Sequence, residues 1–72
     1  MREIKIGRKY KHFKGDIMKV INIAKHSETE ELLVIYEHNN IIWARPYDMF
    51  NSLVDKEKYP DVTQEYRFEE VE

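Results

Sequence analysis

The chain has 72 residues, of which 42% are apolar and 36% charged, with a formal net charge of −2. This length predicts one domain over residues 1–72 and excludes a two-domain enzyme, because natural domains cluster near about 100–150 residues. The absence of cysteine excludes disulfides, thiolate zinc sites and cysteine nucleophiles, so the core has to be stable without crosslinks.

Neither a secretion signal nor a membrane span is expected. Residues 1–7 are charged and lack the apolar run of about 7–15 residues that a signal peptide contains. The longest apolar runs, 32–36 and 41–44, are far shorter than the ~20 residues that cross a bilayer as a helix. We therefore expect a cytoplasmic protein that has no membrane partner.

The charges are unevenly distributed along the chain. Residues 1–25 contain eight Lys or Arg and two acidic residues, whereas residues 26–72 contain four Lys or Arg and twelve acidic residues. The basic segment could face an anionic partner, or it could lie beside the acidic segment within the fold. The second explanation is favoured because the pI is near 5.9, whereas domains that bind nucleic acid non-specifically usually exceed about 9.

Short polar segments divide the first part of the chain into four predicted β-strands. Gly15-Asp16 separates two stretches rich in β-branched and aromatic residues, as a tight turn does. Segment 27–30 and His38-Asn39-Asn40 indicate two further turns. Segment 27–30 also fits a helix-capping pattern, but the residues after it are apolar on every side, which favours a strand. The predicted strands are 8–14, 17–26, 31–37 and 41–45.

The pattern changes at Pro46 and predicts one short helix or 3-10 turn. Proline suits the first helical position, and Asp48 complements the helix dipole in the first turn. Residues 55–63 are expected to form an exposed loop. A last short strand is predicted near 66–68, and residues 69–72 are expected to fray.

These elements predict an all-β fold, a small SH3-like partly open barrel of four to five antiparallel strands with one short helix. A curled sheet lets few residues enclose a core and leaves little free strand edge. The residues expected to form the core are Phe13, Val20, Ile23, Val34, Ala44, Phe50 and Val54.

Four blocks occur in order along the chain: Gly7-x-x-Tyr10-x-His12-Phe13-Lys14-Gly15, Ala24-x-His26-Ser27-Glu28-Thr29-x-Glu31, Val34-x-Tyr36 and Trp43-Ala44-Arg45-Pro46-x-x-Met49-Phe50. This ordered set resembles the DUF1653 family of short bacterial proteins over most of residues 7–54. Met18 stands where that family usually has an aromatic residue, and segment 56–63 is longer than the usual connection to the terminal Arg67-Phe68 pair. The resemblance implies a compact β fold and a bacterial or phage origin, and it carries over no catalytic residues.

Strand alternation suggests a first group of binding residues. It places Tyr10, His12 and Lys14 on one face of the first strand and Phe13 on the other. With Phe13 in the core, the first three would form an outer row able to stack on a ring and donate to an anion. The row could equally be structural, with Tyr10 partly buried and His12 bonded to the backbone.

Two further groups are candidates for the same surface. Trp43 and Arg45 share one strand face, where an indole beside a guanidinium suits a phosphate, a carboxylate or a base. His26 and Glu28 lie at a turn, and turns often carry function on a rigid scaffold. Structural roles compete here too, because Trp43 could cover the barrel end and turn residues often bond the neighbouring backbone.

Metal binding and nucleophilic catalysis have little support in the sequence. None of the three histidines has a second histidine at i+3 or i+4, Ser27 lacks the Gly-x-Ser-x-Gly pattern, and the Gly-rich phosphate loop is missing. A chain of this length is also expected to leave little volume for a pocket of about 300 Å³. We expect no cofactor and no metal.

The sequence therefore predicts a small binding module. Its ligand would be anionic or planar, such as a peptide or protein carboxylate, a nucleotide or single-stranded nucleic acid. One alternative is a small enzyme or accessory subunit that acts on a nucleotide-like substrate through His26 and Glu28; another is a structural domain that docks through a strand edge. The candidate ligand-binding residues are Tyr10, His12, Lys14, His26, Glu28, Trp43 and Arg45.

Overall fold

The computed structural model describes residues 2–71, which form one antiparallel sheet of five strands and one short helix. The elements are β1 (Lys9–His12), β2 (Ile17–Lys25), β3 (Leu32–His38), β4 (Ile41–Pro46), α1 (Tyr47–Phe50) and β5 (Phe68–Val71). The predicted mainly-β fold is therefore confirmed. Within residues 2–71, no helix is long and apolar enough to cross a membrane.

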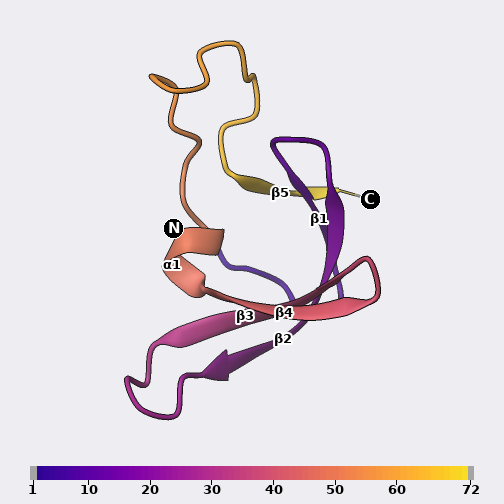
Figure 1. Ribbon diagram of the computed structural model, residues 1–72, viewed down its shortest axis with the longest axis vertical. Helices are drawn as coiled ribbons and strands as arrows, with labels where there is room; N and C mark the ends of the chain where they lie inside the picture. Colours follow the sequence, from indigo (N-terminus) through magenta and orange to yellow (C-terminus); the bar gives the residue numbers. More distant parts are fainter. Residues whose placement is uncertain (1, 72) are drawn as a thin grey trace.

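The sheet is strongly bent and stays open. Its strand order is β4-β3-β2-β1-β5, so four strands form a meander and β5 returns to pair with β1. Figure 1 shows β2, β3 and β4 on one side of the bend and β5 crossing over β1 on the other. The two edge strands, β4 and β5, do not pair with each other, and the core lies inside the bend.

The turns form where the sequence predicts them, and two of them contain residues that tolerate a positive φ. Gly15 has a φ of 109° and donates its N–H to the His12 carbonyl at 2.8 Å, which closes the β1–β2 turn. Asn39 and Asn40 have φ values of 54° and 62° in the two-residue β3–β4 turn. Glu30, with a φ of 62°, lies in the β2–β3 turn.

A cluster of aromatic rings forms the centre of the core. Phe50 of α1 stacks on Phe68 of β5, with ring centroids 4.1 Å apart and planes within 6° of parallel. Tyr10 meets Phe50 edge-on at 5.5 Å, and Tyr36 lies 5.7 Å from the same ring. The buried residues are Ile4, Tyr10, Met18, Val20, Val34, Tyr36, Phe50, Val54 and Phe68.

Four of the seven predicted core residues, Val20, Val34, Phe50 and Val54, are confirmed as buried. Ile23 is half-buried and packs on the core, because a shift in register after Val20 places it opposite Val34. The prediction for Ala44 is wrong, because it pairs with Ile35 and lies exposed on the outer face.

The expected order of inner and outer residues in the first strand is also wrong. Tyr10 is 2% exposed and belongs to the core, and its hydroxyl accepts the Lys5 N–H at 2.9 Å. Phe13 comes after β1 has ended and is only half-buried. Strand alternation therefore does not apply to Phe13, and Tyr10 is the residue of β1 that points inward.

The C-terminal residues form a strand where a frayed end was predicted. β5 pairs with β1 from His12–Phe68 to Lys9–Val71, and Lys11 lies opposite Glu69. Lys5 and Arg8 lie 4.0 Å and 3.9 Å from the Glu70 carboxylate. Part of the basic segment therefore lies beside acidic residues of β5 at the surface of the fold, in line with the second explanation.

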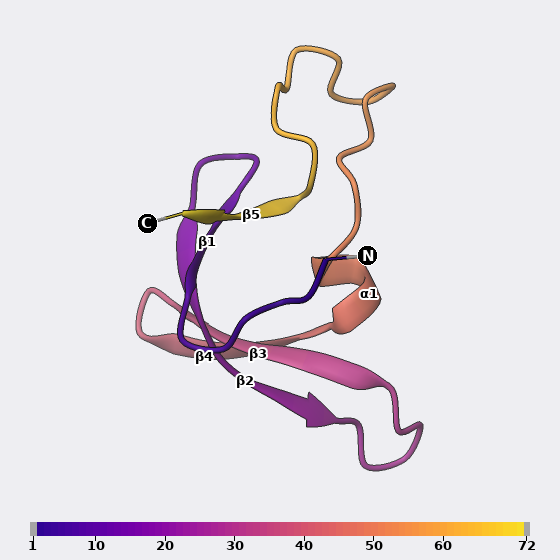
Figure 2. The ribbon, with the colours of Figure 1, turned by 180° about the vertical axis from the view of Figure 1, so that it is seen from behind.

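Hydrogen bonds hold the N-terminal segment 2–6 against α1, β1 and β5. The Ile4 N–H donates to the Tyr47 hydroxyl at 2.9 Å, next to the Lys5–Tyr10 bond described above. The Arg2 guanidinium donates to the Asn51 side chain and to the Phe68 carbonyl. Figure 2 shows this segment crossing the molecule from α1 toward the start of β1.

We predict that Phe50→Ala lowers the free energy of unfolding by about 3–5 kcal/mol, because it removes a fully buried ring and its stacking partner's contact. The neighbouring substitution Met49→Ala is the control and should change it by less than about 0.5 kcal/mol, because Met49 is 49% exposed. Urea unfolding followed by circular dichroism measures both values. Equal losses in the two variants would contradict the central role of the stacked pair.

Candidate anion-binding pocket

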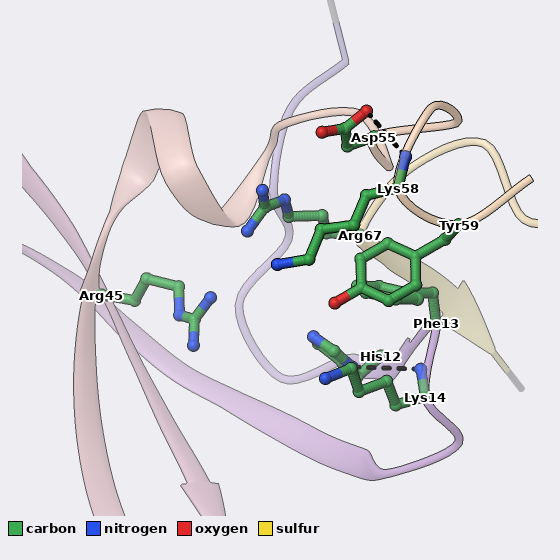
Figure 3. A pocket seen from close by; sticks show the side chains of 8 residues that line it. All are labelled: His12, Phe13, Lys14, Arg45, Asp55, Lys58, Tyr59 and Arg67. Atoms are coloured by element: carbon green, nitrogen blue, oxygen red, sulfur yellow. Dashed lines mark hydrogen bonds between the residues drawn. The ribbon is translucent and has the colours of Figure 1, made fainter.

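A pocket of about 330 Å³ lies between the β1–β2 turn, β4 and the loop that joins α1 to β5. Its volume exceeds what the sequence led us to expect. The pocket is lined by His12, Phe13, Lys14, Arg45, Asp55, Lys58, Tyr59 and Arg67 (Figure 3). Four cations and one carboxylate give the lining a net charge of +3 with neutral His12, although the chain carries −2.

The loop 55–64 forms a braced wall of this pocket. Its base is closed where the Val54 N–H donates to the Glu65 carbonyl at 2.9 Å. Inside the loop, the Lys56 ammonium donates to the Gln64 carbonyl at 2.8 Å. The Gln64 side chain donates to the Lys11 carbonyl at 2.9 Å and so ties the loop to β1. Figure 1 shows the loop at one end of the molecule, above β1 and β5.

Arg67 enters the pocket from the position directly before β5 in the chain. Its backbone N–H donates to the Ser52 carbonyl, and its carbonyl accepts the Phe13 N–H, both at 2.9 Å. These two bonds fix the backbone of Arg67 and therefore the position of its Cα atom. The Arg67 Nε is buried and has no hydrogen-bond partner among residues 2–71. A buried, charged donor without a partner costs about 1–3 kcal/mol or more, which marks the guanidinium as a candidate for an external acceptor.

Arg45 reaches the pocket from β4. It pairs with Val34 and so lies on the inner face of the sheet, at the border of the core. Its guanidinium carbon lies 5.1 Å from the centroid of the Phe68 ring, a cation–π contact that keeps the group over the core. No hydrogen bond or ion pair joins this guanidinium to another residue in the described range 2–71, so its donors remain available.

His12 contributes an uncharged imidazole to the lining. Its Nδ1 accepts the Lys14 N–H at 3.1 Å, so the neutral imidazole carries its proton on Nε2. The ring packs edge-on against Phe68 at 4.9 Å. Burial lowers the pKa of His12 below its usual value of 6.5, and the positive charge of Arg45 lowers it further. Lys14 and Arg67 act in the same direction, whereas Asp16 opposes them.

Two aromatic rings form the wall opposite the arginines. The Phe13 and Tyr59 centroids are 4.9 Å apart, with planes inclined at 58°. The ammonium groups of Lys14 and Lys58 each lie 5.6 Å from the Tyr59 centroid. In Figure 3 the nitrogen ends of Arg45, Arg67 and Lys58 point toward a common space, with the Tyr59 hydroxyl at its edge.

The only carboxylate of the lining is already used by its own loop. One Asp55 oxygen accepts the N–H groups of Glu57 at 3.0 Å and Lys58 at 3.4 Å. No ion pair connects Asp55 to an arginine or lysine within residues 2–71. No ion pair with Asp55 therefore offsets the cations of the pocket, and guanidinium and ammonium groups of this kind bind the oxygen atoms of a phosphate or carboxylate.

A second hollow has a larger volume, about 490 Å³, but it is more open to solvent and its lining carries a smaller net charge. It lies between β1, β2 and the β3–β4 turn, and its lining places Glu37 beside Lys9 and Lys19. His38 at its edge lies 3.8 Å from the Asp16 carboxylate. Charges of both signs therefore offset one another there. In residues 2–71, no three His, Asp or Glu side chains are grouped closely enough to hold a metal ion.

The structure brings together three of the seven residues predicted for the site. His12, Lys14 and Arg45 line the pocket, whereas Tyr10 belongs to the core. Trp43 shares the inner face with Arg45 but lies outside the pocket, 45% exposed, with its indole N–H donating to the His38 carbonyl at 3.3 Å.

His26 and Glu28 lie far from the pocket. They belong to the β2–β3 turn, which Figure 1 places at the opposite end of the long axis from the 55–64 loop. His26 Nδ1 accepts the N–H groups of Glu28 and Thr29 at 3.1 Å and 3.3 Å, so this imidazole organises its turn. The expectation that the three groups of candidate residues form one surface is therefore wrong.

Sequence reasoning missed five residues of the pocket. Phe13 was predicted to lie in the core. Asp55, Lys58 and Tyr59 belong to segment 55–63, which was predicted only to be an exposed loop. Arg67 was noticed only as part of a terminal pair. The usable signal was the Lys58-Tyr59 pair itself, because an aromatic residue beside a cation in an otherwise polar loop is typical of a binding surface.

We predict that His12 titrates below 6.5 and that this lowers the stability of the fold in mild acid. Because the folded state binds fewer protons than the unfolded state, the free energy of unfolding should fall as pH drops through 6.5 toward the lower pKa of folded His12. An NMR titration of the ring protons gives the pKa, and urea unfolding at several pH values gives the stability. In His12→Gln the decrease over this range should be smaller. A pKa at or above 6.5 would contradict the prediction.

Comparisons with known proteins place the chain in a family. A model of the family described as "Protein of unknown function (DUF1653)" matches residues 8–70, which covers nearly the whole chain and confirms the resemblance. The comparisons with curated proteins and with solved structures gave no match. On the basis of the family match, the chain belongs to the DUF1653 family.

Proposed function

We propose that this protein is a small binding module whose pocket between the β1–β2 turn, β4 and the 55–64 loop binds an anionic ligand. The observation that carries the proposal is the buried Arg67 Nε, which has no partner in the described residues, beside the unpaired guanidinium of Arg45. An anion in the pocket would accept hydrogen bonds from the guanidinium groups of Arg45 and Arg67 that line it and would offset their charge.

The energetics of buried charge support this function. Gathering cations at a partly dehydrated site is unfavourable unless an opposite charge compensates them. Guanidinium groups offer planar forks of donors that match the oxygen atoms of phosphate and carboxylate groups. Because the chain as a whole is acidic, the attraction is confined to the pocket, which favours a small anionic group over a long polyanion.

The structure gives less support to the other functions considered from the sequence. An enzyme using His26 and Glu28 would need a free imidazole beside a pocket, whereas His26 Nδ1 is bonded to its own turn. The two edge strands are open, but no particular contact or charge pattern favours docking through them. The cytoplasmic location and bacterial origin expected from the sequence stay predictions.

We predict that inorganic phosphate shifts the amide signals of the pocket residues and that Arg45→Gln weakens this binding by about 10- to 100-fold. A hydrogen bond to a charged group contributes roughly 1.5–3 kcal/mol, which corresponds to such a factor. Amide chemical-shift titrations give the affinities and locate the site.

Arg8→Gln is the matched control, because it removes the same charge from an exposed arginine that lies beside Glu70 and outside the pocket. It should leave phosphate affinity almost unchanged. If Arg8→Gln and Arg45→Gln weaken binding equally, or if the shifts cluster outside the pocket, the proposed function is wrong.

A further inference from the structure

The pocket has two chemically different sides. Arg45 and Arg67 present guanidinium groups on one side, and Phe13 and Tyr59 present aromatic rings on the other (Figure 3). Both rings are only half-buried, so part of each is accessible. A ligand that fills the pocket would therefore combine an anionic group with an adjoining flat group.

The charge of the lining selects among anions. A phosphomonoester carries about −1.5 to −2 near pH 7 and offers three free oxygens, whereas a carboxylate or a phosphodiester carries only a single charge. The lining has a net charge of +3, and its donors come from two guanidinium forks, two ammonium groups and the His12 Nε2–H. A phosphomonoester matches both the charge and the number of donors best.

The aromatic side suits a nucleobase. Phe13 and Tyr59 are inclined at 58° and so do not stack flat on each other. An aromatic side chain stacks on any base, because every base has a π-face. The ammonium groups of Lys14 and Lys58 lie 5.6 Å from the Tyr59 centroid, so positive charge adjoins the ring on which the base would stack.

The size of the pocket limits the ligand to one nucleotide unit. Its volume of about 330 Å³ lies near the lower end of ligand pockets, which span roughly 300–1,000 Å³. A second nucleotide would extend beyond the pocket onto the surface of the protein.

We propose that the pocket binds a nucleoside monophosphate, with its phosphomonoester on Arg45 and Arg67 and its base on Tyr59 and Phe13. This inference rests on the proposed function, because it names the ligand class of the same pocket. The unit could be a free nucleotide or the phosphorylated end of a nucleic-acid strand, since both present the same phosphate and base.

Calorimetry and amide chemical-shift titrations with adenosine monophosphate, adenosine, inorganic phosphate and acetate test the proposal on the full chain. Adenosine monophosphate should bind at least tenfold more tightly than adenosine or inorganic phosphate, and inorganic phosphate more tightly than acetate. The shifts should cluster at 12–14, 45, 58–59 and 67.

Substitutions test the recognition of the base and of the phosphate separately. Tyr59→Leu should weaken adenosine monophosphate roughly tenfold, since stacking on one ring strengthens binding by about that factor, and leave inorganic phosphate unchanged. Trp43→Leu is the matched control, because this exposed aromatic residue lies outside the pocket, and it should change neither affinity. If Tyr59→Leu does not fold, Phe13→Leu takes its place. Arg67→Lys keeps the charge but loses the fork, so it should weaken both phosphates.

A 5′-phosphorylated trinucleotide and its unphosphorylated form identify the source of the ligand. Binding of the phosphorylated form at least as tight as that of adenosine monophosphate supports a strand end, and weaker binding supports a free nucleotide. Equal affinities for adenosine monophosphate and inorganic phosphate, or for inorganic phosphate and acetate, would overturn this inference while leaving an anion-binding pocket. If none of the anions shifts the pocket signals, the proposed function fails as well.

Discussion

The stacking of Phe50 on Phe68 is the contact on which both the core and the candidate site depend. It joins α1 to β5, and the two rings are 0% and 1% exposed. The same Phe68 ring supports the edge of His12 and the guanidinium of Arg45, and Arg67 directly precedes it in the chain. Phe68 therefore packs in the core and also helps to position His12, Arg45 and Arg67 in the pocket.

A positive pocket forms in an acidic protein because its lining contains a single carboxylate, that of Asp55, together with four cations. Glu70 lies beside Lys5 and Arg8 on the edge formed by β5, and Asp55 accepts backbone N–H groups of its own loop. The uneven charge along the chain does not by itself produce the pocket, because three of its four cations, Arg45, Lys58 and Arg67, come from the acidic segment 26–72.

Local chemistry determined much of the fold in advance. The turn at Gly15 and the pair Asn39-Asn40 adopt positive φ values, which few residues tolerate, so the strands between them could be placed from the sequence. The residues on the inner face of the first strand could not be predicted in this way. Whether Tyr10 or Phe13 enters the core depends on where β1 ends, and the end is set by hydrogen bonds with β2 and β5 rather than by residue type.

By itself, the sequence determined the β-strand pattern, the short helix after Pro46 and three of the pocket residues, His12, Lys14 and Arg45, because these follow from turn chemistry and residue type. Only the tertiary structure decided which distant residues join them. The 55–64 loop has no periodic pattern, and its position comes from bonds such as Gln64 to the Lys11 carbonyl, 53 residues away. Contacts over such separations leave no local signal, which is why the packing of Phe13 against Tyr59 and the place of Arg67 in the pocket were found only in the folded chain.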